Sequence, residues 1–382
     1  MRRGTVALFA AGFLQGASFV LVPALGTILR SAPYGMGNTT YGILYFPEIA
    51  GAVLAALSAG ALYRRVGSGG LFRLGASSNA VAMVLLVLVS FSGSLAFFLL
   101  LGETLMLGIG FGLTNAAINR GASLLFPGSA AAAVTLLNAV IGGATAVSPM
   151  ILDGLQVWLS WALWPAALLL GWLVLLAVPQ AMEAVRSELG GLRAWKLSML
   201  PFALAVLVYA ICEGSFGSWA NVLVSVDHHL PAADGGLALS LFWGGMTAAR
   251  FVLGALPGSW VPRRPIYLAA PGVMAVCFLL LPHFYGAVAL LALFAAAGAA
   301  CGIFYPYSMA YGVASHGAEG TQMAGLLVGA LMVGEGIGST GLGLLQQYVS
   351  LNRIYTFSAL WALPLIWLAW RNSHSSQAGR QV

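Results

Sequence analysis

The sequence predicts an all-α membrane protein with twelve transmembrane helices, in two six-helix bundles related by a pseudo-twofold axis along the membrane normal. Three observations predict this fold. Hydrophobic residues make up 60% of the chain and charged residues 7%, which is far from the composition of a soluble domain. The apolar residues form stretches of about 20 residues, the length that crosses a hydrocarbon core of about 30 Å. A longer polar segment divides these stretches into two equal sets.

Short polar connections separate the apolar stretches and fix where each helix begins and ends. In chain order we predict spans at 5–28, 39–62, 71–92, 94–118, 129–152, 158–179, 197–224, 236–259, 265–282, 285–312, 320–346 and 353–370. The first span follows Arg2 and Arg3 directly and precedes further spans, so we interpret it as a retained helix and not a cleaved signal. Spans and connections use up nearly the whole chain, so the functional groups are expected between the helices.

The basic residues predict the orientation of the protein. With twelve spans both termini lie on one side, and that side carries Arg2, Arg3, Arg64, Arg65, Arg73, Arg120, Arg186, Arg193, Lys196, Arg263, Arg264, Arg371 and Arg380. The opposite loops carry only Arg30 and Arg353. The positive-inside rule therefore places both termini in the cytoplasm, with the inner membrane of a prokaryote as the expected location. Because the net charge of +6 is spread over loops, we predict no nucleic-acid partner.

The chain is predicted to consist of an N-terminal bundle, residues 1–180, a cytoplasmic linker, 181–196, and a C-terminal bundle with a short tail, 197–382. A shift of a little over 190 residues places Gly60-Ala61-Leu62 on Gly254-Ala255-Leu256, and Gly110 and Gly112 near Gly302. Six spans per half make this a parallel repeat, an arrangement found in many secondary transporters.

The connection after the second span has the sequence GALYRRVGSGGLFR, from Gly60 to Arg73. It resembles the signature Gly-x-Leu-x-Asp-Arg-x-Gly-Arg of the major facilitator superfamily, with Gly60, Leu62, Arg65 and Gly67 matching. The resemblance implies a gating or structural role for Gly60, Arg65 and Gly67. Arg64 stands where the family has an acidic residue, so the charge contact of this loop in the family is not expected here.

A narrower resemblance is to the fucose-permease-like branch of that superfamily. Asn119 and Pro149 match its pattern in the fourth and fifth spans, whereas Asn115 replaces an Asp and Asn138 a His. Later spans keep further matching residues, namely Tyr209, Glu213, Trp219, Trp243, Gly244, Gly245 and Arg250, together with the segment GIFYPYS at 302–308.

Five charged residues stand out within the predicted spans: Glu48, Glu103, Glu213, Arg250 and Glu335. Placing an ionisable side chain at the bilayer centre costs at least about 2.5–3.5 kcal/mol, so each is a functional candidate. We predict that Glu103, Glu213 and Glu335 bind substrate hydroxyls or exchange a proton, with an ion pair or a hydrogen-bonded acid as the alternative. Glu48 is expected in a wetted outer vestibule. Arg250 is expected to have a gating or packing role.

Neutral polar and aromatic residues complete the predicted site. Gln15, Asn115 and Asn138 can donate and accept hydrogen bonds, which suits a solute that carries hydroxyl groups. Trp243 and Tyr305 are candidates for stacking on a sugar ring, with packing or contact with lipid as the alternative. Asn119, beside Arg120, is interpreted as structural.

The sequence contains no recognisable cofactor or metal motif. Cys212, Cys277 and Cys301 lie within predicted spans without the spacing of metal ligands. His228 and His229 are interpreted as part of a solvated loop, and His316 and Glu319 as ordinary turn residues. Neither a nucleophile–base pair nor a phosphate-binding loop is evident, so the chain is not expected to be an enzyme.

These features favour a secondary transporter that moves a small polar, sugar-like solute by alternating access. Its expected partners are the solute, the lipid bilayer and, for symport, protons; uniport remains open because Asn115 and Asn138 cannot titrate. We expect a monomer. The alternatives are an efflux transporter for amphiphilic, drug-like compounds and a non-transporting receptor on the same scaffold.

Overall fold

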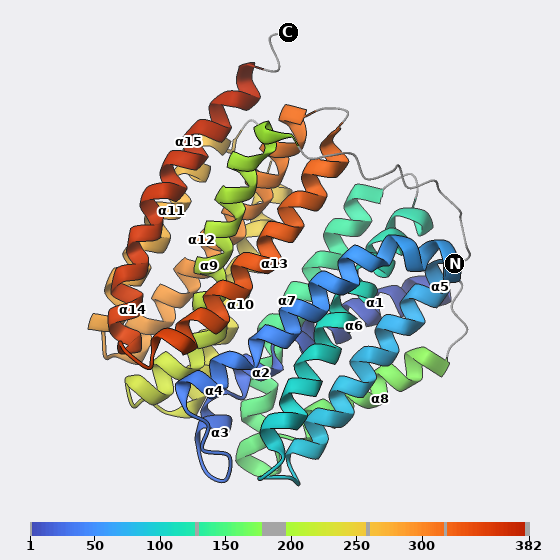
Figure 1. Cartoon of the computed structure of the whole chain (residues 1–382), viewed down its shortest axis with the longest axis vertical. Coiled ribbons are helices and arrows are strands. Elements are labelled where there is room, and N and C mark those ends of the chain that lie inside the picture. Colours follow the sequence, from blue (N-terminus) through green and yellow to red (C-terminus); the bar gives the residue numbers. More distant parts are fainter. Residues whose placement is uncertain (1, 127–129, 178–195, 257–259, 317–318, 379–382) are drawn as a thin grey trace. The chain divides into compact units, whose positions relative to one another are not determined.

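The computed structural model describes residues 2–126, 130–177, 196–256, 260–316 and 319–378. Within these ranges the regular structure is helical, with no β-strand (Figure 1). The chain divides into two compact units, residues 1–189 and 190–382, called here the N-terminal unit and the C-terminal unit. The predicted linker 181–196 lies outside the described residues except for Lys196.

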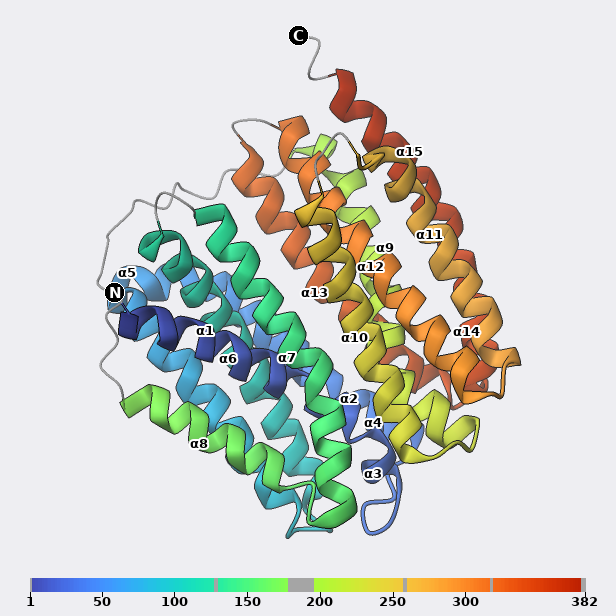
Figure 2. The same ribbon diagram turned by 180° about the vertical axis from the view of Figure 1, so that it is seen from behind.

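The N-terminal unit contains eight described helices, several of which run side by side (Figure 2). Their bounds are α1 Arg2–Phe19, α2 Leu21–Ala24, α3 Gly26–Arg30, α4 Asn38–Ile43, α5 Tyr45–Val89, α6 Ala96–Leu125, α7 Ala130–Trp158 and α8 Leu163–Ala177.

The C-terminal unit is built from longer helices joined by short 3₁₀ and π segments. Its elements are η2 Leu197–Met199, α9 Leu200–Val222, η3 Leu223–Asp227, α10 Ala232–Ala255, α11 Arg263–Leu280, η4 Leu281–His283, α12 Ala287–His316, α13 Gly320–Leu345, α14 Leu351–Ser358, η6 Ala359–Trp361 and α15 Ala362–Ala378.

Eight helical stretches among the described residues are long and apolar enough to cross a membrane, and the stretch 38–89 includes two of the predicted spans. Gly4–Phe19 and Leu163–Ala177 are apolar but shorter. The structure thus supports an integral membrane protein, while the count of twelve spans stays a prediction.

One predicted span and one predicted connection differ from the helices. The first, 5–28, is one stretch in the prediction but is interrupted at Val20 and Leu25, whose ψ angles are near zero. Pro23 lies between these breaks and has no backbone N–H to donate to a helix. The predicted connection between spans 39–62 and 71–92 is instead a kink at Gly67, with φ 70° and ψ −178°, within a continuous helical assignment. Such dihedrals are open almost only to glycine.

Hydrogen bonds to α1, two to its backbone and one to a side chain, connect it to α7 and α8. The Thr145 hydroxyl donates to the Gly16 carbonyl at 3.1 Å, and the Ser148 hydroxyl donates to the Ala17 carbonyl at 2.8 Å. The Trp172 indole N–H donates to Ser18 Oγ at 3.2 Å. Because no lipid can replace these bonds, they hold α7 and α8 on α1.

Glycines allow a pair of helices in each unit to approach closely. A Cβ on Gly108 of α6 would collide with the Glu48 carbonyl of α5, and a Cβ on Gly298 of α12 would collide with the Phe242 carbonyl of α10. The second contact follows the first by about 190 residues, in keeping with a parallel repeat of the helices. Backbone contact of this kind requires small residues at the interface.

Candidate functional site

A pair of buried acids lies between α5 and α6 in the N-terminal unit. Glu103 is fully buried, and neither of its carboxylate oxygens has a hydrogen-bond partner among the described residues. Glu48 is 7% exposed and interacts electrostatically with Glu103. The expectation of a wetted vestibule at Glu48 is therefore wrong, because the close contact of its backbone with Gly108 brings this segment into the helix interface.

Two carboxyl groups in one buried site strongly disfavour the state in which both are ionised. Such a pair is suited to binding a proton or to receiving hydrogen bonds from a solute. Of the two, only Glu103 was among the residues predicted for the site.

Gln15 belongs to a buried network of neutral side chains next to α6. The Asn79 amide group donates to the Gln15 side-chain oxygen at 2.9 Å and to the Thr114 hydroxyl at 3.3 Å. All three residues are buried, and they come from α1, α5 and α6. Gln15 Nε2 has no hydrogen-bond partner among the described residues, so a donor remains for a solute or water.

The three asparagines near the predicted cytoplasmic ends of α6 and α7 are bonded in a row. Asn119 donates to the Asn115 side-chain oxygen at 2.6 Å, and Asn138 donates to the Asn119 side-chain oxygen at 3.2 Å. Asn119 therefore links the two residues that were predicted to bind substrate. Asn138 is exposed and Asn115 is half-buried, so the outer end of this row is open to further hydrogen bonds.

Glu213 lies in an aromatic environment in the C-terminal unit. The residue is 6% exposed, and its carboxyl group lies beside the Tyr209 side chain and is attracted by Arg250. The Tyr209 ring stacks on Tyr305, with 6.2 Å between centroids and an interplanar angle of 12°. The structure thus brings together Glu213, Tyr305 and Arg250, which were predicted as candidates separately. Tyr209, part of the quoted resemblance, was not among the predicted site residues.

Glu335 and Trp243 flank the same helix, α9, from two sides. A Cβ on Gly214 would meet the Glu335 backbone, and a Cβ on Gly217 would lie 3.2 Å from the Trp243 ring. Both side chains are half-buried. Glycines of α9 therefore allow α10 and α13 to pack closely against the segment that carries Glu213.

The buried cysteines make sulfur and van der Waals contacts within the C-terminal unit. The Cys301 thiol approaches the Met274 sulfur at 3.7 Å, and all three cysteines are reduced and buried. No group of three potential metal ligands occurs in the described parts of the chain.

Neither family models nor curated proteins match the sequence. Solved structures, however, match nearly its full length. The nucleoside transporter NupG superposes with a TM-score of 0.73 at 13% identity, covering 96% of this chain and 99% of NupG. A D-xylose–proton symporter gives a TM-score of 0.74 at 13% identity, covering 96% of each chain. The chain has the fold of the major facilitator superfamily.

A third structure with this fold, from work on substrate recognition in proton-dependent oligopeptide transporters, has a TM-score of 0.74 at 12% identity and covers 99% of this chain and 100% of its own. The predicted resemblance to the major facilitator superfamily is thus confirmed for the fold. Assignment to the fucose-permease-like branch stays a prediction.

The segment that resembles the superfamily signature lies within α5 and makes an aromatic contact where the family has an acidic residue. Arg64 and Arg65 are exposed, whereas Tyr63 is buried. The Arg120 guanidinium of α6 lies over the Tyr63 ring, 4.3 Å from its centroid. A cation–π contact of this kind stabilises by about 0.5–2 kcal/mol. It connects this part of α5 to α6, although Arg64 replaces the acidic residue of the family signature.

Of the polar residues that were interpreted as loop or turn positions, His228 is buried, whereas His316 and Glu319 are partly exposed. His228 is 6% exposed and packs its ring against Tyr285, with 5.0 Å between centroids. His316 and Glu319 line a pocket at one end of the C-terminal unit. The sequence placed His228 near the end of a span but did not show that this side chain is buried.

Proposed function

We propose that this protein is a secondary transporter that moves a small polar solute across a membrane by alternating access of its two units. The observation that carries the proposal is Glu103, a buried acid without a hydrogen-bond partner in the described chain, on a helix of a major facilitator fold. A side chain of this kind is costly to place at bilayer depth, so its presence there supports a role in transport.

The surroundings of the acids favour a neutral solute that carries hydroxyl groups, such as a sugar or a nucleoside. Gln15 offers a free amide donor, and Tyr305 offers an aromatic face next to Glu213. Similar structures bear the names of xylose, nucleoside and oligopeptide transporters, two of which are named for proton coupling. These groups support transport and not catalysis.

We further propose that Glu103 or Glu213 takes up the coupling proton. Burial disfavours the charged carboxylate, so a proton can bind on one side of the membrane and leave on the other. Glu213 has Arg250 as a neighbouring positive charge, whereas the charged neighbour of Glu103 in the described residues is Glu48. The two acids are thus in different electrostatic surroundings, and Glu103 is our first candidate.

The test is uptake of radiolabelled pentoses, hexoses and nucleosides into proteoliposomes, with and without an inward-acidic or inward-alkaline pH gradient. We expect one class of solute to accumulate under one gradient, and the variant Glu103→Gln to lose gradient-driven accumulation while retaining exchange. Asp234→Asn, at the start of α10, is the matched control. If no solute is transported, the proposal of a transporter is wrong. If Glu103→Gln and Glu213→Gln both keep the wild-type response to the gradient, the proposal that one of these acids takes up the coupling proton is wrong.

A further inference from the structure

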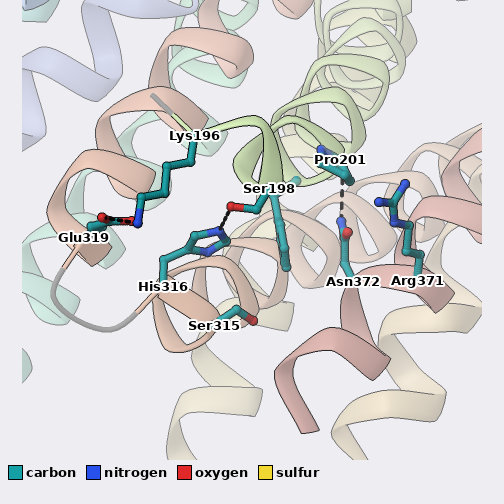
Figure 3. A pocket seen from close by; sticks show the side chains of 9 residues that line it. Lys196, Ser198, Pro201, Ser315, His316, Glu319, Arg371 and Asn372 are labelled. Atoms are coloured by element: carbon teal, nitrogen blue, oxygen red, sulfur yellow. Dashed lines mark hydrogen bonds and ion pairs between the residues drawn. The ribbon is translucent and has the colours of Figure 1, made fainter. Parts of the chain in front are cut away.

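A cavity of about 560 Å³ lies within the C-terminal unit where α9 begins, α12 ends and α15 approaches its end (Figure 3). Its walls include two permanent cations, Lys196 and Arg371, and one acid, Glu319. His316 and the hydroxyl groups of Ser198 and Ser315 add further polar groups.

The polar side chains of this cavity are ordered by contacts with one another. Lys196 Nζ lies 2.6 Å from a Glu319 carboxylate oxygen, and Ser198 Oγ lies 3.2 Å from His316 Nε2. His316 Nδ1 lies 2.9 Å from the Gly312 carbonyl oxygen, which can only accept a hydrogen bond, so Nδ1 is the donor. In the neutral ring Nε2 then accepts a hydrogen bond from the Ser198 hydroxyl group. The pocket therefore has a defined set of side chains and one cation more than acids.

The outer face of α15 beside the pocket has the character of a helix at the membrane–water interface. Leu363, Trp367 and Trp370 are 67%, 55% and 52% exposed and lie on one side of the helix. The Arg371 guanidinium lies 5.8 Å from the centre of the Trp367 ring. Exposed tryptophans next to arginine are typical of the level of the lipid headgroups.

We propose that this pocket binds the phosphate headgroup of an anionic phospholipid, with Lys196 and Arg371 as counter-ions and the exposed face of α15 against the acyl chains. Basic pockets between transmembrane helices bind such headgroups, above all on the cytoplasmic side, which is the side that the distribution of Arg and Lys predicts for this end of the unit. Free phosphate shares the headgroup chemistry but leaves the apolar face of α15 without a role.

Glu319 gives the proposal an internal test, because it already neutralises Lys196. A bound phosphate competes with the Glu319 carboxylate for the same ammonium group, so Glu319 weakens lipid binding. Removing that acid and removing either cation are therefore expected to have opposite effects.

The experiment measures binding of dioleoyl phosphatidylglycerol to the purified full-length protein by native mass spectrometry and by the shift in melting temperature. Dioleoyl phosphatidylcholine and inorganic phosphate are the comparison ligands. Near a membrane surface each Lys or Arg contributes about 1 kcal/mol to binding of anionic lipid, so Lys196→Gln and Arg371→Gln should each weaken phosphatidylglycerol binding about fivefold. Glu319→Gln should strengthen it, and Arg353→Gln in α14 is the matched control.

Preference for phosphatidylglycerol over phosphatidylcholine, reduced about fivefold in each cation variant and enhanced in Glu319→Gln, supports the proposal. Equal binding of the two lipids, unchanged binding in the cation variants, or an equal effect of inorganic phosphate overturns it. These outcomes do not depend on which solute the protein transports, since no transport is measured.

Discussion

Asn79 is the residue that joins the buried polar network of the N-terminal unit, because its amide group donates to both Gln15 and Thr114. Replacing it by alanine leaves buried polar atoms unpaired, which costs about 1–3 kcal/mol for each group. We therefore expect Asn79→Ala to lower the melting temperature of the purified protein. Ser78→Ala, one residue away on the same helix, is the control, and equal melting temperatures for the two variants would contradict the role given to Asn79.

His228 makes the stability of the protein sensitive to mild acid. Burial lowers its pKa from the usual 6.5, so the folded state favours the neutral ring. Below pH about 6.5 the unfolded chain then binds more protons than the folded one, and stability falls as the pH falls. Asp227, His229, Tyr285 and Asn352 are the polar groups around this ring.

Melting temperatures measured between pH 7.5 and 5 should therefore decline less steeply in His228→Gln than in the wild type. His229→Asn, which removes an exposed neighbouring ring, serves for comparison. An identical decline in His228→Gln and the wild type would exclude His228 as the source.

At this scale the sequence identified chemical candidates but not their partners. Gln15 was predicted because its amide can donate and accept hydrogen bonds, and the same reasoning applied to Asn79 would have identified its hydrogen-bond partner. Glu48 was recognised as an intramembrane acid, yet its burial depends on Gly108, which is 60 positions away. Pairing between spans is a tertiary property and is not visible in the local pattern.

Gly67 determines how the two helical stretches of α5 meet. Its φ of 70° and ψ of −178° belong to a region that costs a residue with a Cβ about 1–3 kcal/mol. We expect Gly67→Ala to lower the melting temperature and the yield of folded protein, as judged by size-exclusion chromatography in detergent.

Gly254 of α10 provides the matched control for this variant. No atom lies within 4 Å of a Cβ built on Gly254, and alanine favours helix by up to about 1 kcal/mol over glycine. Gly254→Ala should therefore be neutral or stabilising, and a loss of stability equal to that of Gly67→Ala would contradict the explanation.

The positions of helices were predictable where a long apolar run of the sequence forms a single helix. Long apolar runs predicted α9 and α12 to within four residues at each end, whereas α6 continues seven residues beyond its predicted end. The motif match predicted a special role for Gly67 but not that helical assignment continues through it. The breaks at Val20 and Leu25 were missed because hydropathy does not register the missing N–H of Pro23.

For the whole molecule, two compact units within one chain lead to a prediction about fragments. The internal contacts of residues 1–189 and 190–382 hold each unit together, and similar glycine contacts between helices recur in both. Each half should therefore insert into the membrane and remain monodisperse when expressed alone, although transport, as proposed, requires both. The measurement is fluorescence-detected size-exclusion chromatography of each tagged fragment, with uptake assayed after coexpression.

A fragment that ends at Gly93 is the informative control, since it contains α5 but lacks α6, the helix that contacts α5 through Gly108 and Gly51. Close packing between faces of small residues holds helices together in lipid, and α5 loses this packing when its partner helix is absent. Residues 1–93 should therefore aggregate under conditions in which residues 1–189 do not. If both fragments behave alike, the division of the chain into two units does not describe how it folds, and alternating access between those units loses its structural basis.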